Sequence, residues 1–170
     1  MVIEMNESYI ELLVKKENTI KGTLLRVLCI ALTASAVLLA LGGGGIVAMA
    51  AAVAFGVLTY FVWLNTDIEY EYLYLDKELS IDKIMSKTKR KKVATFEIER
   101  MEILAPADSY HLDDYKNRTF KISDYSSGVI RQPDKRYVMI YDGTQKIFLT
   151  EDPKFASVIK NIAPRKVFLD

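Results

Sequence analysis

Residues 27–64 read VLCIALTASAVLLALGGGGIVAMAAAVAFGVLTYFVWL and contain no Lys, Arg, Asp or Glu. This run is too long for one buried helix of a soluble domain and long enough for two crossings of a bilayer. The glycines at 42–45 divide it, because glycine favours a tight reversal over a continued helix. We therefore predict a transmembrane helical hairpin over 24–64, with crossings at 24–41 and 46–64. The alternative is one long bent helix.

Basic residues gather on both flanks of this run and are absent from the glycine turn. Cytoplasmic flanks of membrane helices carry such an excess, so both termini are predicted to be cytoplasmic in a multi-pass protein of the cell membrane. Ala48-Met49-Ala50 resembles a signal-peptide cleavage site, but the apolar segment before it already spans a membrane, which favours a retained anchor. The flanking cations are Lys15, Lys16, Lys21 and Arg26 before the run, and Lys77, Lys83 and the cluster at 87–92 after it.

Small residues recur along one face of the second predicted crossing. Ala48, Ala52 and Gly56 stand four residues apart, and small side chains at this spacing let two helices approach closely in lipid. We interpret the face as packing within the hairpin, with a homo-oligomer seam as the alternative. Neither crossing contains Asp, Glu, His, Asn or Gln, which argues against a conduction pathway through the hairpin.

The segment before the membrane, residues 1–23, has its own apolar pattern. Ile10, Leu13 and Val14 fall on one face of a helix. A cytoplasmic N-terminal segment with a short interfacial helix is therefore predicted, and a partly ordered tail is the alternative.

After Thr66 the pattern changes to alternating polar and apolar side chains. Tyr70, Tyr72 and Tyr74 show the period of two that is typical of a strand. The predicted fold class is α+β: the transmembrane hairpin is followed by a cytoplasmic antiparallel β-sheet domain over 66–170 with a C-terminal helix, and the helix closes one end of a curved sheet. The predicted strands are 69–75, 79–85, 93–98, 101–104, 118–123, 136–141 and 145–150, and the helix follows Asp152-Pro153 and ends at Pro164.

Composition and motifs exclude several functional classes. The chain has 23 Lys+Arg and 22 Asp+Glu among its 170 residues, whereas nucleic-acid binding needs a surplus of positive charge. Cys29 and His111 are the one cysteine and the one histidine, so neither belongs to a multi-thiolate or paired-histidine metal site. For His111, near Asp113 and Asp114, a solvated loop is favoured over a metal site. We predict a non-enzyme with no catalytic residue, cofactor, metal or nucleic-acid partner.

A dense basic run follows the second predicted strand. On a strand connection close to the membrane, each cation near an anionic surface contributes about 1 kcal/mol. The alternative is a solvated tip that acts only as an orientation signal. Alternate residues of a strand point to opposite faces, so only some of these cations can touch lipid together. The candidate contacts to anionic lipid headgroups are Lys87, Lys89, Arg90, Lys91 and Lys92.

The order of two crossings, seven strands and a helix resembles the bacterial membrane-anchored PH-like domain proteins. The hairpin Tyr72–Met85, the basic connection and Thr95–Ile103 (TFEIERMEI) are similar to the strand, basic turn and I-x-x-I segment of that family. Residues Met5–Val14 (MNESYIELLV) are similar to a family of small uncharacterised membrane proteins of Firmicutes. The resemblance implies a PH-like fold and membrane anchoring, and it implies no catalytic residue.

These patterns predict a non-enzymatic binding or scaffolding module anchored in the lipid bilayer. Its partner would be a membrane or cytoplasmic protein received at a free strand edge or a groove. Two alternatives remain open. One is a sensor of anionic lipid surfaces that uses the basic run, and the other is a structural hairpin that forms a homo-oligomer.

Overall fold

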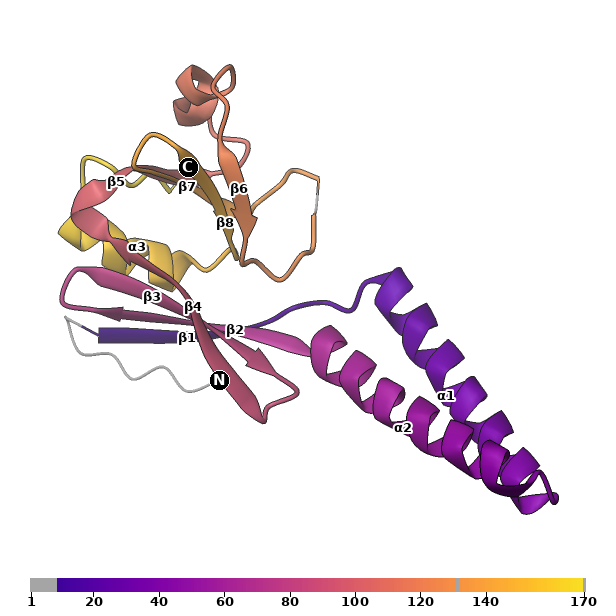
Figure 1. Cartoon of the computed structure of the whole chain (residues 1–170). Coiled ribbons are helices and arrows are strands. Elements are labelled where there is room, and N and C mark those ends of the chain that lie inside the picture. Colours follow the sequence, from indigo (N-terminus) through magenta and orange to yellow (C-terminus); the bar gives the residue numbers. More distant parts are fainter. Residues whose placement is uncertain (1–8, 131, 170) are drawn as a thin grey trace. The chain divides into compact units, whose positions relative to one another are not determined.

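The computed structural model describes residues 9–130 and 132–169, which form two compact units. The hairpin unit contains Asn18–Ile68 and the short segment Met85–Lys89. The β domain contains the described residues up to Glu17, together with Glu69–Ile84 and the chain from Arg90 onward. The chain therefore leaves the β domain, passes through the hairpin unit and returns, as the colours of Figure 1 allow the reader to follow.

The hairpin unit is built from α1 (Ile20–Leu41) and α2 (Gly45–Thr66). Both helices are long and apolar enough to cross a membrane, with mean hydropathies of 2.4 and 2.2. Gly43 and Gly45 have φ angles of 96° and 65° between and at the start of the helices, a conformation that glycine adopts without strain. The predicted reversal is confirmed, and the alternative of one long bent helix is wrong.

Two threonines join the helices of the hairpin. The hydroxyl oxygens of Thr33 and Thr59 lie 2.9 Å apart across the α1–α2 contact. Each hydroxyl also lies 2.8 Å from a carbonyl one turn earlier in its own helix, that of Cys29 for Thr33 and that of Phe55 for Thr59. Because a hydroxyl has one proton, one threonine donates to the other threonine, which donates to the carbonyl of its own helix. Hydrogen bonds of this kind are a recognised source of helix association in lipid, where apolar surface gives little preference for one neighbour over another.

The N-terminal segment forms a strand where an interfacial helix was predicted. Strand β1 (Tyr9–Lys15) pairs antiparallel with β2 (Ile68–Leu75), from Tyr9 opposite Leu75 to Lys15 opposite Glu69. The apolar residues of this segment fit both a helix and a strand. Ile10 and Val14 belong to the predicted helical face and also to a set of alternating residues. The alternating set is buried, and its members are Ile10, Leu12 and Val14, with 2%, 6% and 5% of their surfaces exposed.

The described residues contain eight strands in two four-stranded sheets. Seven of them match the predicted strands in order, and the eighth is β1. The predicted antiparallel β-sheet domain is confirmed, with one exception: β6 runs parallel to β8 in the second sheet. Sheet A has the order β1-β2-β3-β4, with β3 Glu78–Met85 and β4 Lys89–Glu97; sheet B has the order β5-β7-β8-β6, with β5 Met101–Pro106, β6 Lys121–Asp124, β7 Tyr137–Tyr141 and β8 Gln145–Leu149.

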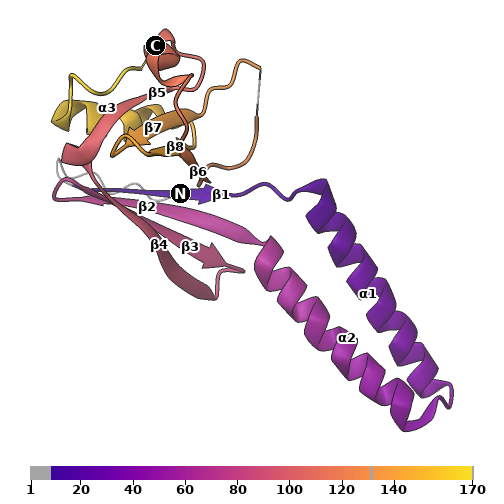
Figure 2. The ribbon, with the colours of Figure 1, turned by 45° about the horizontal axis from the view of Figure 1, so that its top comes forward.

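The predicted C-terminal helix is α3 (Pro153–Ile162), and it closes one end of the two layers (Figures 1 and 2). Its first turn is capped as the sequence indicates, since the Asp152 carboxylate accepts a hydrogen bond from the Phe155 amide at 2.8 Å. Phe155 is fully buried, and its ring packs against Tyr72 of β2 at 5.5 Å between centroids. Two short 3₁₀ helices, η1 (Ile98–Arg100) and η2 (Tyr110–Tyr115), connect the strands.

Tyr72 links the two sheets through its hydroxyl group. The hydroxyl donates to the Tyr125 carbonyl at 2.7 Å and accepts from the Thr150 amide at 3.2 Å. The side chain is fully buried, and this burial raises the pKa of the phenol far above its ordinary value. A buried phenol with both hydrogen-bonding roles satisfied stabilises one arrangement of the β domain, because any shift leaves a polar group unpaired.

The β1–β2 ladder places both ends of the hairpin on one side of any membrane that it crosses. Lys15 and Glu69 are paired neighbours in sheet A, and the whole hairpin lies between them in the sequence. A single crossing would put the two strands on opposite sides, where they could not pair. The membrane-spanning segments between β1 and β2 are therefore even in number, which agrees with two transmembrane helices.

Paired cysteines test this ladder. In a Cys29→Ser background, we expect Lys15→Cys with Glu69→Cys to form a disulfide on mild oxidation, because directly opposed strand residues have Cα separations of roughly 4.5–5.5 Å. The control pair, Lys15→Cys with Leu73→Cys, is displaced by four residues, or roughly 13 Å along the strand, and should not form one. Thiol-blocking mass spectrometry of the full chain in membranes measures both. A disulfide in the control pair alone would show that β1 has another register.

Candidate functional site

The predicted basic run begins beside the end of α2. The turn between β3 and β4 belongs to the hairpin unit, where the Ser86 amide donates to the Asp67 carbonyl at 2.8 Å. The Ser86 hydroxyl also donates to the Trp63 carbonyl at 3.4 Å. Lys87 on this turn and Lys89 at the start of β4 are exposed, next to the end of the second apolar helix. The local geometry therefore puts two of the five predicted lipid contacts at a helix end.

Arg26 of α1 lies at the same end of the hairpin. Its guanidinium carbon lies 5.0 Å from the centre of the Trp63 ring, and its Nε donates to the Thr66 hydroxyl at 2.5 Å. A second nitrogen donates to the Asn18 side chain at 3.1 Å. A cation over an indole ring at the end of two apolar helices is typical of the membrane–water interface, where a long side chain reaches toward the aqueous phase.

Arg90 differs from the four lysines of the run because two carboxylates hold it. Its guanidinium forms ion pairs with Glu71 and with Asp82, the latter at 2.6 Å from Nε. The side chains of Glu71 and Asp82 are only 9% and 14% exposed. Arg90 therefore serves to neutralise the outer face of sheet A. The four lysines of the run are exposed and form no ion pair with the residues that the structure describes; they are Lys87, Lys89, Lys91 and Lys92.

The carboxylates around Arg90 have opposite pKa shifts. Burial and hydrogen bonding to Glu11 raise the pKa of Glu71, and the Arg90 charge partly offsets this rise. The pKa of Glu11 is lowered, first by the hydrogen bond that the Tyr9 hydroxyl donates to it at 2.6 Å. The cluster joins β1, β2, β3 and β4. We therefore assign its ion pairs and hydrogen bonds to the stability of sheet A and not to ligand binding.

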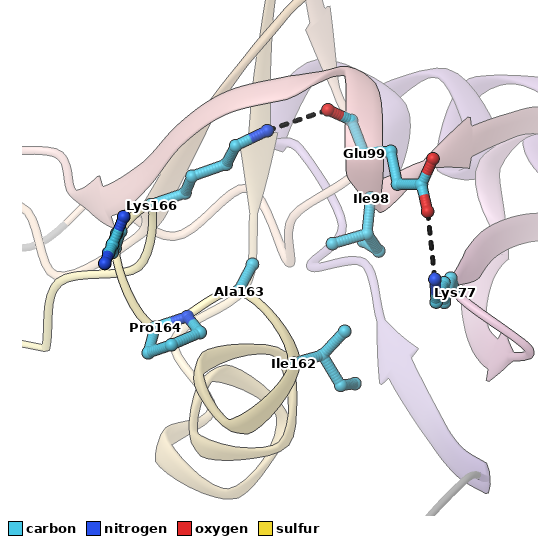
Figure 3. A pocket seen from close by; sticks show the side chains of 8 residues that line it. Lys77, Ile98, Glu99, Ile162, Ala163, Pro164 and Lys166 are labelled. Carbon is cyan, nitrogen blue, oxygen red and sulfur yellow. Dashed lines mark hydrogen bonds and ion pairs between the residues drawn. The ribbon is translucent and has the colours of Figure 1, made fainter.

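A hollow of about 400 Å³, here called the α3-end pocket, opens elsewhere on the β domain (Figure 3). Three segments that are distant in the sequence form it: the β2–β3 turn, η1 and the chain at the end of α3. Pockets that bind small ligands typically begin at about 300 Å³, so this hollow is large enough for a ligand group. Its lining residues are Lys77, Ile98, Glu99, Ile162, Ala163, Pro164, Arg165 and Lys166.

Hydrogen bonds around Glu99 fix the mouth of the α3-end pocket. The Lys77 ammonium lies 2.9 Å from the Glu99 carboxylate, and the Lys166 ammonium donates to the Glu99 carbonyl at 2.7 Å. Figure 3 shows the two lysines reaching Glu99 from opposite sides. The hydrogen bond from Lys77 lowers the pKa of Glu99, so this carboxylate is ionised at neutral pH. Arg165 forms no ion pair or hydrogen bond with any residue that the structure describes.

The three residues of the predicted small-residue face lie on α2. Ala48, Ala52 and Gly56 are all half-buried within the single chain. A Cβ added at Gly56 would meet no atom within 4 Å, so α1 does not require a glycine there. Close packing within the hairpin therefore does not explain Gly56, and a seam between copies of the chain stays a prediction.

His111 lies in an aromatic stack instead of a solvated loop. Its ring lies 3.6 Å from that of Phe168 and 4.0 Å from that of Tyr110, measured between centroids. Within the described ranges, no cluster of three or more His, Cys, Asp or Glu side chains has the geometry of a metal site. Exposed charge lies at the four lysines of the basic run, and charge lies beside apolar surface at the α3-end pocket.

A known protein family matches most of this chain. Residues 6–169 match the family described as Bacterial PH-like domain (DUF6106). The chain belongs to this family. The match begins before β1 and continues past α3, so the hairpin between β1 and β2 lies inside the family region. No curated protein and no solved structure matches the chain. The resemblance to PH-like proteins is confirmed, and PH-like domains in general serve as binding modules.

Removing the Arg90 charge tests the carboxylate cluster. We expect Arg90→Gln to destabilise the chain by about 1–3 kcal/mol at pH 7, between the values for an exposed and a buried ion pair. Without the cation, the folded pKa of Glu71 rises further above its unfolded value of about 4.3. The folded chain then binds more protons, so its stability falls as pH rises, and the difference from wild type grows between about pH 4 and neutrality.

Urea unfolding of the full chain in mild detergent, followed by the β-sheet circular dichroism signal, measures this difference. Lys92→Gln removes an exposed cation from the same strand and should change stability by less than about 0.5 kcal/mol. Equal losses in the two variants, or a loss that does not depend on pH, would contradict the role given to Arg90.

Proposed function

We propose that this chain is a membrane-anchored, non-enzymatic binding and scaffolding module that holds its PH-like domain at the cytoplasmic face of the cell membrane. The observation that carries the proposal is the ladder between β1 and β2, which brackets the two apolar helices. Both ends of the anchor enter the same folded domain. Such a domain is tethered by two covalent connections, which limits its reach from the bilayer more than one flexible linker would.

The distribution of cations supports the cytoplasmic side. Arg26 and the turn around Lys87 and Lys89 lie at the ends of the helices that connect to the β domain. The opposite end, with the glycines at 42–45, carries no basic residue. An excess of Lys and Arg on short flanks sets the cytoplasmic side of membrane helices.

Cysteine labelling tests the orientation. In a Cys29→Ser background, Leu41→Cys places a thiol at an exposed position beside the glycine turn, and Thr88→Cys places one on the β3–β4 turn. A membrane-impermeant maleimide applied to intact cells should label Leu41→Cys. It should label Thr88→Cys only after the cells are opened. The reverse pattern would place the PH-like domain outside the cytoplasm and overturn that part of the proposal.

Two alternatives have an observation in their favour. The four exposed lysines of the basic run favour contact with anionic lipid, since each cation near such a surface adds about 1 kcal/mol. The open space beside Gly56 favours contact between hairpins of two copies. A binding module remains the leading proposal because the family is PH-like and the β domain carries a formed pocket.

Photo-crosslinking in living cells separates these functions. We expect a photoreactive phenylalanine on the β domain, introduced at Tyr110, Ile122 or Arg165, to give adducts with other proteins. These three positions are exposed, so their substitution removes no core contact. The same photoreactive residue is introduced separately at Lys91 of the basic run and at Ala52 of α2. Adducts with lipid alone, concentrated at Lys91, would favour the lipid-surface alternative. Adducts with a second copy alone, concentrated at Ala52, would favour the structural hairpin. Either of these last two patterns would contradict the leading proposal.

A further inference from the structure

We propose that the α3-end pocket binds an acidic peptide segment of a protein partner. In this arrangement an apolar side chain of the peptide lies between Ile98, Ile162 and Pro164, and a neighbouring carboxylate contacts Arg165 and Lys166. The inference deepens the proposed function and rests on it, because it names the chemical class of partner that the binding module receives.

Charge is the first argument for an acidic ligand. Three cations line the pocket, Lys77, Arg165 and Lys166, against the single carboxylate of Glu99. Lys77 forms an ion pair with that carboxylate, whereas Lys166 donates to the neutral carbonyl of Glu99 and forms no ion pair with the described residues. Arg165 is exposed and has no ion pair among the residues that the structure describes. A guanidinium in this state favours a carboxylate, which it binds through two parallel hydrogen bonds.

Glu99 shows how a carboxylate is held at this site. Its side chain accepts a hydrogen bond from Lys77 at 2.9 Å, and Lys166 contributes a second attractive charge. The domain thus already binds one carboxylate of its own at the rim. An acidic side chain of a partner would meet the same kind of donors on the other side of the pocket, at Arg165 and Lys166.

The backbone around the pocket is fixed before any ligand arrives. The Lys166 amide donates to the Ala163 carbonyl at 3.0 Å, and the Lys166 carbonyl accepts from the Leu104 amide of β5 at 2.8 Å. The Ile98 amide donates to the Lys77 carbonyl at 2.8 Å. Two walls of the pocket are therefore anchored by main-chain hydrogen bonds, and binding need not order them.

The apolar lining of the pocket favours a peptide over a free anion as the ligand. Ile98, Ile162, Ala163 and Pro164 contribute no charged group to the hollow, so phosphate alone would leave it unfilled. The volume of about 400 Å³ is near the lower end of the range for ligand pockets, which suits one apolar side chain with its acidic neighbour. A phospholipid with two acyl chains is a poorer match, and the experiment below includes it as an opposing outcome.

The experiment uses the full chain in nanodiscs of phosphatidylcholine. The probes are a fluorescein-labelled set of amidated hexapeptides in which Leu and Glu are adjacent and the other positions vary, with a matched set carrying Gln in place of Glu. Fluorescence anisotropy gives each affinity. We expect the Glu peptides to bind roughly fivefold or more tightly than the Gln peptides, and the preference to fall as salt rises.

Substitutions locate the binding. Arg165→Gln and Lys166→Gln should each weaken the best Glu peptide roughly fivefold, whereas Glu99→Gln should strengthen it because a competing carboxylate is lost and Lys77 is freed. Lys154→Gln removes an exposed cation of α3 that does not line the pocket, and it should leave affinity unchanged. The methyl NMR signals of Ile98 and Ile162 should shift when the Glu peptide is added. Circular dichroism melting shows that each variant remains folded.

Three results would overturn the inference: no peptide of the set binding below about 1 mM, equal affinity for Glu and Gln peptides, or equal effects of Arg165→Gln and Lys154→Gln. Methyl shifts of Ile98 and Ile162 that require phosphatidylglycerol in the nanodisc, and not peptide, would assign the pocket to lipid instead. If the peptides fail while photo-crosslinking from Tyr110 or Ile122 still finds proteins, this pocket is wrong and the binding function stands. If both fail, the proposed function fails with it.

Discussion

The pairing of β1 with β2 is the constraint on which the rest of the structure depends. Every residue from Tyr9 to Lys15 has a partner in β2, and the two membrane-length helices fit between the strands. This single ladder decides that the hairpin returns to its starting side and that the domain is held by two connections. It also places Ile10, Leu12 and Val14 in the core, so sheet A is incomplete without residues that precede the membrane segment.

Two kinds of interaction hold that sheet in place, one on each face. On the inner face, Tyr72 packs on Phe155 and bonds to the main chain of two later segments. On the outer face, Arg90 binds Glu71 and Asp82 and balances two carboxylates that are nearly buried. Both faces thus combine burial with paired polar groups, although Glu71 Oε2 and Asp82 Oδ1 accept no hydrogen bond from the described residues. Such combinations favour one register, because alternatives leave further buried groups unpaired.

Local patterns in the sequence were sufficient for most of the fold. The apolar run, the glycine turn, seven strands in order and the Asp152-Pro153 helix start all depend on neighbours within a few residues. The role of residues 9–15 was missed because their apolar residues fit a helix and a strand equally, and the strand is decided by a partner more than fifty residues away. The α3-end pocket left no local signal, since its three segments meet only in the folded domain. For the same reason, Arg90 looked like its neighbouring lysines until Glu71 and Asp82 were placed beside it.

The position of β1 also sets an order of events during synthesis. Strand β1 is synthesised before both helices and β2 after them, so β1 has no partner until the hairpin has been made. Once α1 and α2 are side by side, Arg26 holds their ends together through Thr66 and Trp63. Closing a long loop is entropically unfavourable, and the packed hairpin has already closed this one. Packing of α1 against α2 therefore lowers the entropic cost of pairing β1 with β2, and loss of that packing weakens the attachment of the N-terminal strand.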